Sequence, residues 1–138
     1  MKIARGFLFA GLHSGIKPNK KDLALVFSKT PCAGAACQTI NRAKAAPVID
    51  AEARVPSPAI HAVLINSGNA NALTGAQGVK DVQLVTAEAA KALGVEGGVL
   101  MASTGVIGVR LPKEKILAAI PRLVESLKPC LLYTSRCV

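Results

Sequence analysis

The amino-acid sequence predicts a layered α/β (or α+β) fold, in which helices pack on a sheet. Three observations support this fold class. The chain has 138 residues, which is enough for one domain with a hydrophobic core. Hydrophobic residues make up 51% of it but aromatic residues only 3%, so the core must be aliphatic. A strand, helix, strand unit in the second half is typical of such folds.

Two apolar segments near the N-terminus predict a β-hairpin. Residues 7–10 form its first strand, the turn-rich residues 14–20 its loop, and residues 22–28 its return strand. The apolar centre of the return strand is continuous, which indicates burial on both faces. Thr30-Pro31 is expected to end it.

The middle of the chain predicts a short strand over residues 38–41 and a brief helix over residues 47–53, which begins with a proline. Residues 56–58 read Pro-Ser-Pro and break the chain between elements. Residues 59–65, rich in Ile, Val and Leu, predict a strand that runs directly into the polar residues 66–71. For that loop we favour a self-bracing turn of asparagines over the polar wall of a pocket.

The clearest helix covers residues 78–93 and has one apolar stripe, with Gly94 placed to end it. A buried strand over residues 97–102 follows, and Ser103-Thr104-Gly105 leaves its end. If the two strands that flank this helix are parallel neighbours, residues 66–71 and 103–105 meet at one edge of the sheet. Open α/β sheets place their ligands at such an edge.

The end of the chain predicts one more helix and a tail. Leu111-Pro112 begins a helix with an apolar face, and Pro121 inside it predicts a break near Ile120. Residues 130–135 resemble a translated sequencing adaptor, and residues 129–138 are expected to be a non-native tail. The partial domain would then occupy residues 1–128.

Lysine and arginine total 17 against eight acidic residues, which gives a net charge of +9. Such an excess attracts nucleic acid, membrane surfaces or carboxylate substrates. The charges are scattered, and the two densest clusters, residues 17–21 and 113–115, are interpreted as solvated surface. Few aromatic rings are present for bases to stack on, and no signal peptide or run of about 20 apolar residues is found. We therefore expect a cytoplasmic chain with no nucleic acid and no membrane as partner.

The cysteines do not have the spacing of a structural zinc site. We expect them to be free thiols in a reducing compartment. No metal site and no bound cofactor is predicted. The four residues are Cys32, Cys37, Cys130 and Cys137.

Four motifs follow one another between residue 5 and about residue 128. They are Gly15-Ile16-Lys17-Pro18 with Lys21-Asp22-Leu23-Ala24-Leu25-Val26, then Asn41-Arg42-Ala43-Lys44-Ala45-Ala46-Pro47-Val48, Ile65-Asn66-Ser67-Gly68-Asn69-Ala70-Asn71 and Ser103-Thr104-Gly105-Val106-Ile107-Gly108. Together they resemble the N-terminal part of the glutamate N-acetyltransferase / ornithine acetyltransferase family of arginine biosynthesis. The order of the four motifs is far more specific than any one of them.

The resemblance implies a partial domain of the self-cleaving ornithine acetyltransferase / aminopeptidase type. Family members are made as a precursor that cuts itself once into an α chain and a β chain, and this sequence would supply most of the α chain. The new N-terminal Thr of the β chain takes the acetyl group from N-acetylornithine and passes it to glutamate. Some members also accept acetyl-CoA as donor. The complete enzyme would be an oligomer of αβ units.

The resemblance also implies two catalytic residues. In the family a Thr hydroxyl and the backbone N–H of the next Gly stabilise the oxyanion, and they match Thr104 and Gly105. None of the six threonines follows an alanine, so the cleavage step and its nucleophile are absent. The chain alone is therefore predicted to be inactive. Gln38-Thr39-Ile40 departs from the aromatic residue and paired threonines that the family usually has there.

Two other functions compete with this one. A self-cleaving aminopeptidase shares the general architecture, although the arginine-pathway motifs favour the acetyltransferase. An RNA-binding module is suggested by the charge and by Gly105-Val106-Ile107-Gly108, which fits the Gly-x-x-Gly loop of KH domains. Val and Ile are poor partners for a phosphate backbone, however, and basic residues do not converge around them.

Overall fold

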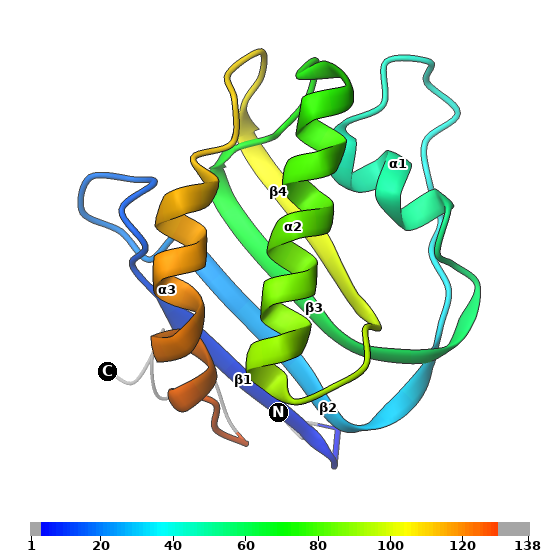
Figure 1. Ribbon diagram of the computed structural model, residues 1–138, viewed down its shortest axis with the longest axis vertical. Helices are drawn as coiled ribbons and strands as arrows, with labels where there is room; N and C mark the ends of the chain where they lie inside the picture. The colour runs from blue at the N-terminus through cyan, green and yellow to red at the C-terminus, as the bar shows by residue number, and fades with distance from the viewer. Residues whose placement is uncertain (1–3, 130–138) are drawn as a thin grey trace.

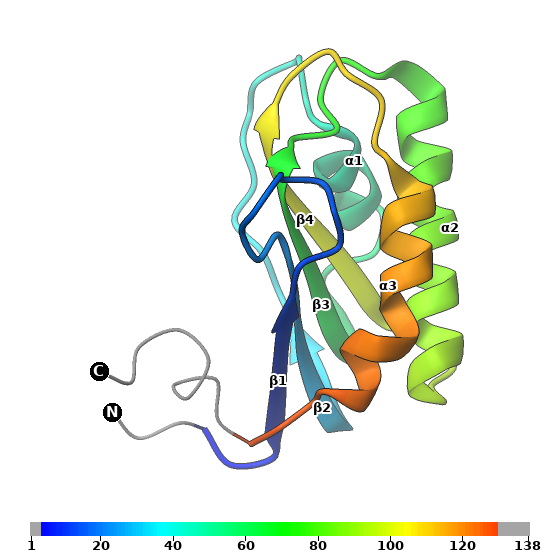
Figure 2. The same ribbon diagram turned by 90° about the vertical axis from the view of Figure 1, so that its left-hand side faces the viewer.

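The computed structural model describes residues 4–129 as one four-stranded sheet with helices on a single face (Figures 1 and 2). The helices α2 and α3 lie side by side across the sheet, and α1 packs next to α2 by the edge strand β4. This confirms the predicted layered α/β class. The elements in chain order are β1 (Phe7–Leu12), β2 (Leu23–Gly34), α1 (Ala46–Glu52), β3 (Ser57–Asn69), α2 (Gly75–Leu93), β4 (Val99–Val106) and α3 (Lys113–Glu125).

The strands lie in the order β1-β2-β3-β4. The strands β1 and β2 form the predicted antiparallel hairpin, and β2 is also antiparallel to β3. The strands β3 and β4 are parallel. The helix α2 connects them and returns the chain to the end of the sheet at which β3 begins. The two strands that flank the clearest helix are therefore parallel neighbours, as predicted.

The hydrophobic core lies between the sheet and the helices α2 and α3. Leu64 of β3 is fully buried, whereas its neighbours Val63 and Ile65 point to the other face and are only partly buried. No helix covers that other face (Figure 2), so the prediction that the return strand is buried on both faces is wrong for the described residues. The helices contribute apolar side chains that their periodicity predicted, together with Ala119, which it did not; the predicted ones are Val82, Val85, Ala89, Ala90, Ile116, Ile120 and Leu123.

Two prolines do not end elements where the sequence predicted. The strand β2 continues past Pro31, because its register to β3 shifts after Phe27 and an irregular stretch does not need the N–H that proline lacks. The helix α3 continues through Pro121, which lies on its exposed side. Buried Ile120 and Leu123 on either side of the proline hold the helix on the sheet, and packing outweighs the lost hydrogen bond.

The remaining boundaries agree in part with the expectations. The helix α1 begins at Ala46, one residue before the predicted proline, and Gly94 follows the last residue of α2. Residues 38–41 form no strand, because Ile40 is fully exposed and no neighbouring strand reaches it. Cys32 and Cys37 are free. Cys130, Cys137 and the predicted tail after Pro129 lie outside the described residues.

The loop between β1 and β2 closes around the buried side chain of Asp22. One carboxylate oxygen accepts hydrogen bonds from Ser14 N (2.6 Å) and Ser14 Oγ (2.8 Å), and the other accepts one from Lys17 N (2.8 Å). Burial by itself would raise the pKa of Asp22, but the N–H and O–H donors of Lys17 and Ser14 outweigh it and the pKa is lowered. The charged form of one carboxylate therefore organises the whole loop.

The stability that Asp22 contributes should depend on pH. Its pKa is lower in the folded than in the unfolded chain, so the contribution is fully present above the unfolded value of about 3.9 and is lost as the pH falls through the lower folded value. Urea unfolding should show that wild type has a larger free energy of unfolding than Asp22→Asn, and that this gap shrinks from about pH 7 to about pH 2.5. Glu125→Gln, an exposed change on α3, should show almost no gap. A constant gap for Asp22→Asn would contradict the role of its charge.

Candidate functional site

The strands β3 and β4 end side by side, and their polar ends form the candidate site. The loops that follow them meet at the same edge of the sheet, as the sequence predicted. Because the strands are parallel, residues at equal depth lie next to each other. The register pairs Asn66 with Ser103, Ser67 with Thr104 and Gly68 with Gly105.

Gly68 and Gly105 are in backbone contact. A Cβ on Gly105 would lie 2.3 Å from the carbonyl carbon of Gly68 and 2.5 Å from Asn69 N, which is too close for any side chain. Gly105 also has a φ of 136°, in the region that favours glycine. Asn69 pairs with both Thr104 and Val106, so the ladder is irregular at Gly105. Irregularities of this kind redirect side chains and backbone groups at strand ends.

Asparagine side chains brace the loop that follows β3. Asn69 Nδ2 donates to the carbonyl oxygens of Val109 (3.0 Å) and Arg110 (3.1 Å), and Asn69 Oδ1 accepts a hydrogen bond from Asn71 N (2.8 Å). Asn66 Nδ2 donates to Asn69 O (2.9 Å). These contacts are the self-bracing that the sequence favoured, but residues 66–69 still belong to β3 and only the residues after Asn69 form the turn. They also attach the loop after β3 to the loop after β4.

Thr104 and Gly105, the two predicted catalytic residues, are both exposed at the end of β4. Immediately before them, Ser103 Oγ is buried without a hydrogen-bond partner within residues 4–129. The same holds for Asn66 Oδ1 on the neighbouring strand. Buried polar atoms are rarely left unpaired. Ser103 Oγ and Asn66 Oδ1 therefore each keep an unused hydrogen-bonding position next to the exposed Thr104-Gly105 step.

A pocket of about 300 Å³ flanks β4 on the side of α1. Its walls are mostly apolar, and it reaches the residue that precedes Thr104. Its volume lies at the small end of the range found for ligand sites. The residues that line it include Cys37, Pro47, Val48, Met101, Ala102 and Ser103.

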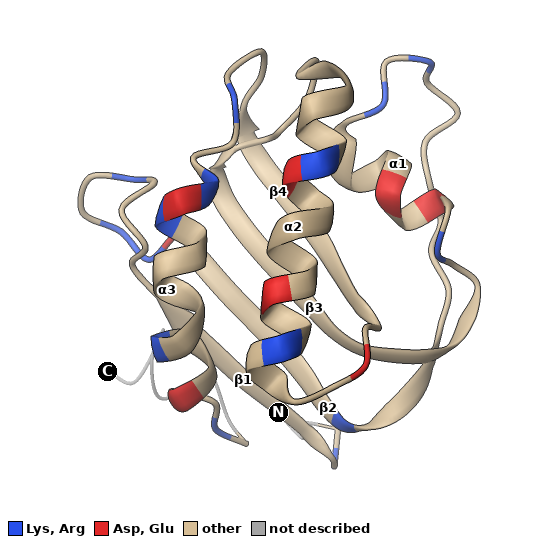
Figure 3. Ribbon diagram, in the orientation of Figure 1, with Lys and Arg blue, Asp and Glu red and all other residues tan. Residues whose placement is uncertain are grey.

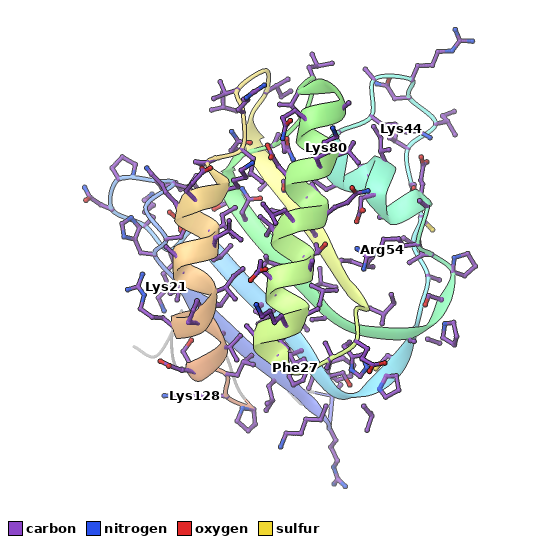
Figure 4. The ribbon with its side chains drawn as sticks, viewed as in Figure 1. Lys21, Phe27, Lys44, Arg54, Lys80 and Lys128 are labelled. Carbon is purple, nitrogen blue, oxygen red and sulfur yellow. The ribbon has the colours of Figure 1, made fainter. Side chains whose placement is uncertain are left out.

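Basic residues lie on three connections around this end of the sheet: the β1–β2 loop, the segment before α1 and the segment before α3 (Figure 3). Lys44, which Figure 4 labels, precedes α1 and forms an ion pair with Glu52. Lys113 Nζ lies 2.6 Å from Asp81 Oδ1 on α2. Burial tends to raise the pKa of Asp81, but hydrogen bonds from Lys113 and Gln77 lower it overall. The interpretation of the second basic cluster as solvated surface is therefore wrong for Lys113.

Sequence reasoning missed the residues that support the site from the β1–β2 loop. A Cβ on Gly68 would lie 2.8 Å from Ile16 Cγ2 and 3.1 Å from Lys17 Cγ, so both side chains rest on this glycine. Ser67 N donates to the carbonyl oxygen of Asp22 (2.8 Å). The first and third sequence motifs contain these residues. Only the pairing of β2 with β3 reveals that the two motifs touch.

Within the part of the chain that the structure describes, no group of three or more His, Cys, Asp or Glu side chains could hold a metal ion. No helix between residues 4 and 129 combines the length and the apolar character that crossing a membrane requires.

Substitution of Gly105 should be far more damaging than substitution of Gly108. Both glycines have a positive φ, but only Gly105 lacks space for a Cβ. We expect Gly108→Ala to cost about 1 kcal/mol of unfolding free energy for its backbone conformation. Gly105→Ala should cost about 1–3 kcal/mol more, because the strands must separate. Equal losses in urea unfolding would show that the Gly68–Gly105 contact imposes no constraint.

The sequence profile of the ArgJ family matches residues 8–137. The arginine biosynthesis bifunctional protein ArgJ of Thermotoga neapolitana is 45% identical over 130 residues, which are 92% of this chain and 33% of that protein. The ArgJ protein of Geobacter sulfurreducens is 47% identical over 125 residues, or 89% of this chain and 32% of that protein. The chain thus spans about a third of the length of these curated relatives.

Solved structures agree with the sequence comparison. The crystal structure of ArgJ from Bacillus halodurans has a TM-score of 0.84 and 35% identity, and the alignment covers 92% of this chain and 66% of that one. Ornithine acetyltransferase from Mycobacterium tuberculosis, solved with ornithine, has a TM-score of 0.85 and 40% identity, and the alignment covers 93% of this chain and 70% of that one. In sequence and in fold, the chain belongs to the ArgJ family.

Proposed function

We propose that this chain is the α-chain part of an acetyltransferase that moves the acetyl group of N-acetylornithine to glutamate in arginine biosynthesis. The observation that carries the proposal is the exposed Thr104-Gly105 step at the shared edge of β3 and β4 in a chain of the ArgJ family. Two findings on relatives support it. The curated relatives are named bifunctional proteins of arginine biosynthesis, and one related structure contains ornithine.

Chain lengths support a precursor that divides into two polypeptides. The aligned region makes up 33% of the Thermotoga neapolitana protein but 66% of the solved Bacillus halodurans chain. The solved chain is therefore about half as long as the curated protein. A single cut near the middle of a precursor would produce this ratio, and the other half would be the β chain that supplies the nucleophile.

The proposed reaction needs a nucleophile and a place for negative charge. A Thr hydroxyl of the β chain attacks the acetyl carbonyl carbon, a C–O bond forms, and the carbonyl oxygen becomes an oxyanion. The C–N bond then breaks, and ornithine leaves with the proton that the Thr hydroxyl gave up. The amine of glutamate next attacks the resulting ester, a C–N bond forms, the ester C–O bond breaks, and the Thr oxygen takes back a proton from the amine as N-acetylglutamate leaves. The Thr104 hydroxyl and the Gly105 N–H would donate hydrogen bonds to the oxyanion. Acetyl-CoA would be an alternative donor to the same nucleophile.

The acetyltransferase is preferred over the two competing functions. The family match favours it over the aminopeptidase. The Gly-x-x-Gly loop that suggested RNA binding exposes 58% of Val106 and 60% of Ile107, and two exposed aliphatic side chains offer no hydrogen bonds to a phosphate backbone.

The 138-residue chain alone should not transfer acetyl groups. It carries the proposed oxyanion donors but no Thr that follows an Ala, so no nucleophile would be released by cleavage. Purified chain mixed with N-acetylornithine and radiolabelled glutamate should give no labelled N-acetylglutamate. Turnover above the buffer control would contradict the proposed division of the site between two chains.

The role of Thr104 can be tested in a complete enzyme. In a chimera, residues 8–128 of this chain would replace the matching segment of the Thermotoga neapolitana protein, which supplies the rest of the enzyme. Thr104→Ala should lower kcat by about 10²–10³-fold, as loss of one oxyanion donor does elsewhere. Thr104→Ser keeps the hydroxyl and should retain most activity.

Thr30→Ala provides the matched control for that experiment, because Thr30 is exposed and lies toward the other end of β2. It should leave kcat unchanged. Circular dichroism would confirm that all variants are folded. An unaltered kcat in folded Thr104→Ala would rule out the oxyanion role.

A further inference from the structure

Four exposed aliphatic side chains lie where β3 and β4 end, beside the candidate site, and we propose that they form the surface on which the β chain docks. The inference rests on the proposed function, because it concerns the partner that carries the nucleophile. The occupant is an apolar part of the β chain next to its N-terminal Thr. The docking surface consists of Leu73, Val106, Ile107 and Val109.

Each residue of the docking surface is more than half exposed. Leu73 is 69% exposed and Val109 54%, and the other two lie between these values. The two segments that carry the surface, residues 70–73 and 106–109, contain no charged residue. Single exposed aliphatic residues are common in proteins, but several together on one uncharged area mark an interaction site.

Backbone hydrogen bonds join the two segments into one surface. Ala70 N donates to Val106 O (2.9 Å), and Gly108 N donates to Ala72 O (2.9 Å). Figure 1 shows the connections after β3 and β4 at the same end of the sheet. The surface is therefore formed before a partner binds, so that little conformational entropy is lost on binding.

Leu73 combines an exposed side chain with a strained backbone. Its φ of 58° is a left-handed conformation that is uncommon for a leucine. Hydrogen bonds on either side hold it there: Thr74 Oγ1 donates to Asn71 Oδ1 (2.8 Å), and Asn71 Nδ2 donates to Gly78 O (3.1 Å). Strained residues cluster at functional sites. Burial of Leu73 by a partner would offset a strain that burial within this chain does not.

The proposed reaction brings the β chain to this place. Its nucleophile must lie about 3–3.5 Å from the acetyl carbon, and the oxyanion about 2.7–3.1 Å from its donors. The first residue of the β chain must therefore come within about 8 Å of Gly105 N. Val106 is the next residue of β4, and consecutive Cα atoms are about 3.8 Å apart. A folded chain that begins at this position is too large to avoid the residues that follow Gly105.

The chemistry of the docking surface favours a polypeptide over a substrate. N-acetylornithine and glutamate carry charges, whose burial against aliphatic side chains is costly. The chain spans about a third of the length of its curated relatives, so most of a complete enzyme lies outside it. A second copy of this chain is the other polypeptide that would fit, and the experiments distinguish the two.

Hydroxyl-radical footprinting of the chimera tests whether the docking surface is covered. The radicals oxidise exposed aliphatic side chains, and two leucines give a matched comparison. Leu73 is 69% exposed, whereas Leu84 on the exposed side of α2 is 42% exposed, so an uncovered Leu73 would react faster. In the chimera we expect the reverse order, with Leu73 oxidised several-fold more slowly than Leu84. A Leu73 that still reacts faster would refute the docking surface.

Substitutions in the cleaved chimera test which chain covers the surface. Leu73→Asn removes an apolar side chain without harm to the backbone, because asparagine tolerates the left-handed conformation. Leu73→Asn and Ile107→Asn should each raise the Kd between the two chains at least about tenfold, as expected for loss of a buried aliphatic side chain. Leu84→Asn is the matched control and should leave the Kd unchanged.

Sedimentation over a dilution series at a fixed urea concentration would give these Kd values, and circular dichroism would confirm that the variants are folded. If Ile107→Asn does not fold, Leu73→Asn still decides the question. An unchanged Kd in folded Leu73→Asn would overturn the proposal. Loss of an oligomer with an unchanged Kd between the two chains would assign the surface to a second copy, and would overturn it as well.

Footprinting also separates a failure of this inference from a failure of the proposed function, because it needs neither cleavage nor turnover. If Leu73 is protected but the chimera transfers no acetyl group, the proposed function fails and the docking surface stands. If the chimera transfers acetyl groups while Leu73 stays exposed, the docking surface fails and the proposed function stands.

Discussion

The backbone contact between Gly68 and Gly105 is the constraint on which the candidate site depends. It exists because β3 and β4 are parallel neighbours. They are parallel because α2, which connects them, returns the chain to the end of the sheet at which β3 begins. With a Cβ 2.3 Å from the opposite carbonyl carbon, no other residue fits at Gly105 without separation of the strands. The Thr-Gly step is thus held against the end of β3 by the ladder itself.

Two buried polar side chains then fix the loops on either side of this contact. Asp22 closes the β1–β2 loop on the Gly68 side, and Asn69 holds the loop after β4 through the carbonyl oxygens of Val109 and Arg110. The Asn69 side chain bonds to backbone groups, and the Asp22 carboxylate accepts hydrogen bonds from two backbone N–H groups and the Ser14 hydroxyl. Burial of these side chains costs little, because their polar atoms are satisfied. The geometry of the proposed oxyanion donors is therefore preorganised by this chain and does not require the nucleophile to be present.

The sequence predicted what depends on local pattern and missed what depends on partners distant in the chain. The stripe of α2, its end before Gly94 and the parallel strand pair follow from apolar periodicity and turn chemistry. The path of β2 past Pro31 and the unbroken α3 at Pro121 are decided by tertiary packing, which overrides a local signal. The contact of the Ile16 and Lys17 side chains with Gly68 could not be predicted, because the two segments lie about fifty residues apart in the chain.

Hydrogen-bond donors at this edge of the sheet suit a charge that appears only during a reaction. Those at Thr104 and Gly105 would act on a charge that exists only while the acetyl carbon is tetrahedral, so they can lower the barrier. Both donors belong to β4, and the contact of Gly105 with the backbone of Gly68 fixes where they lie relative to β3.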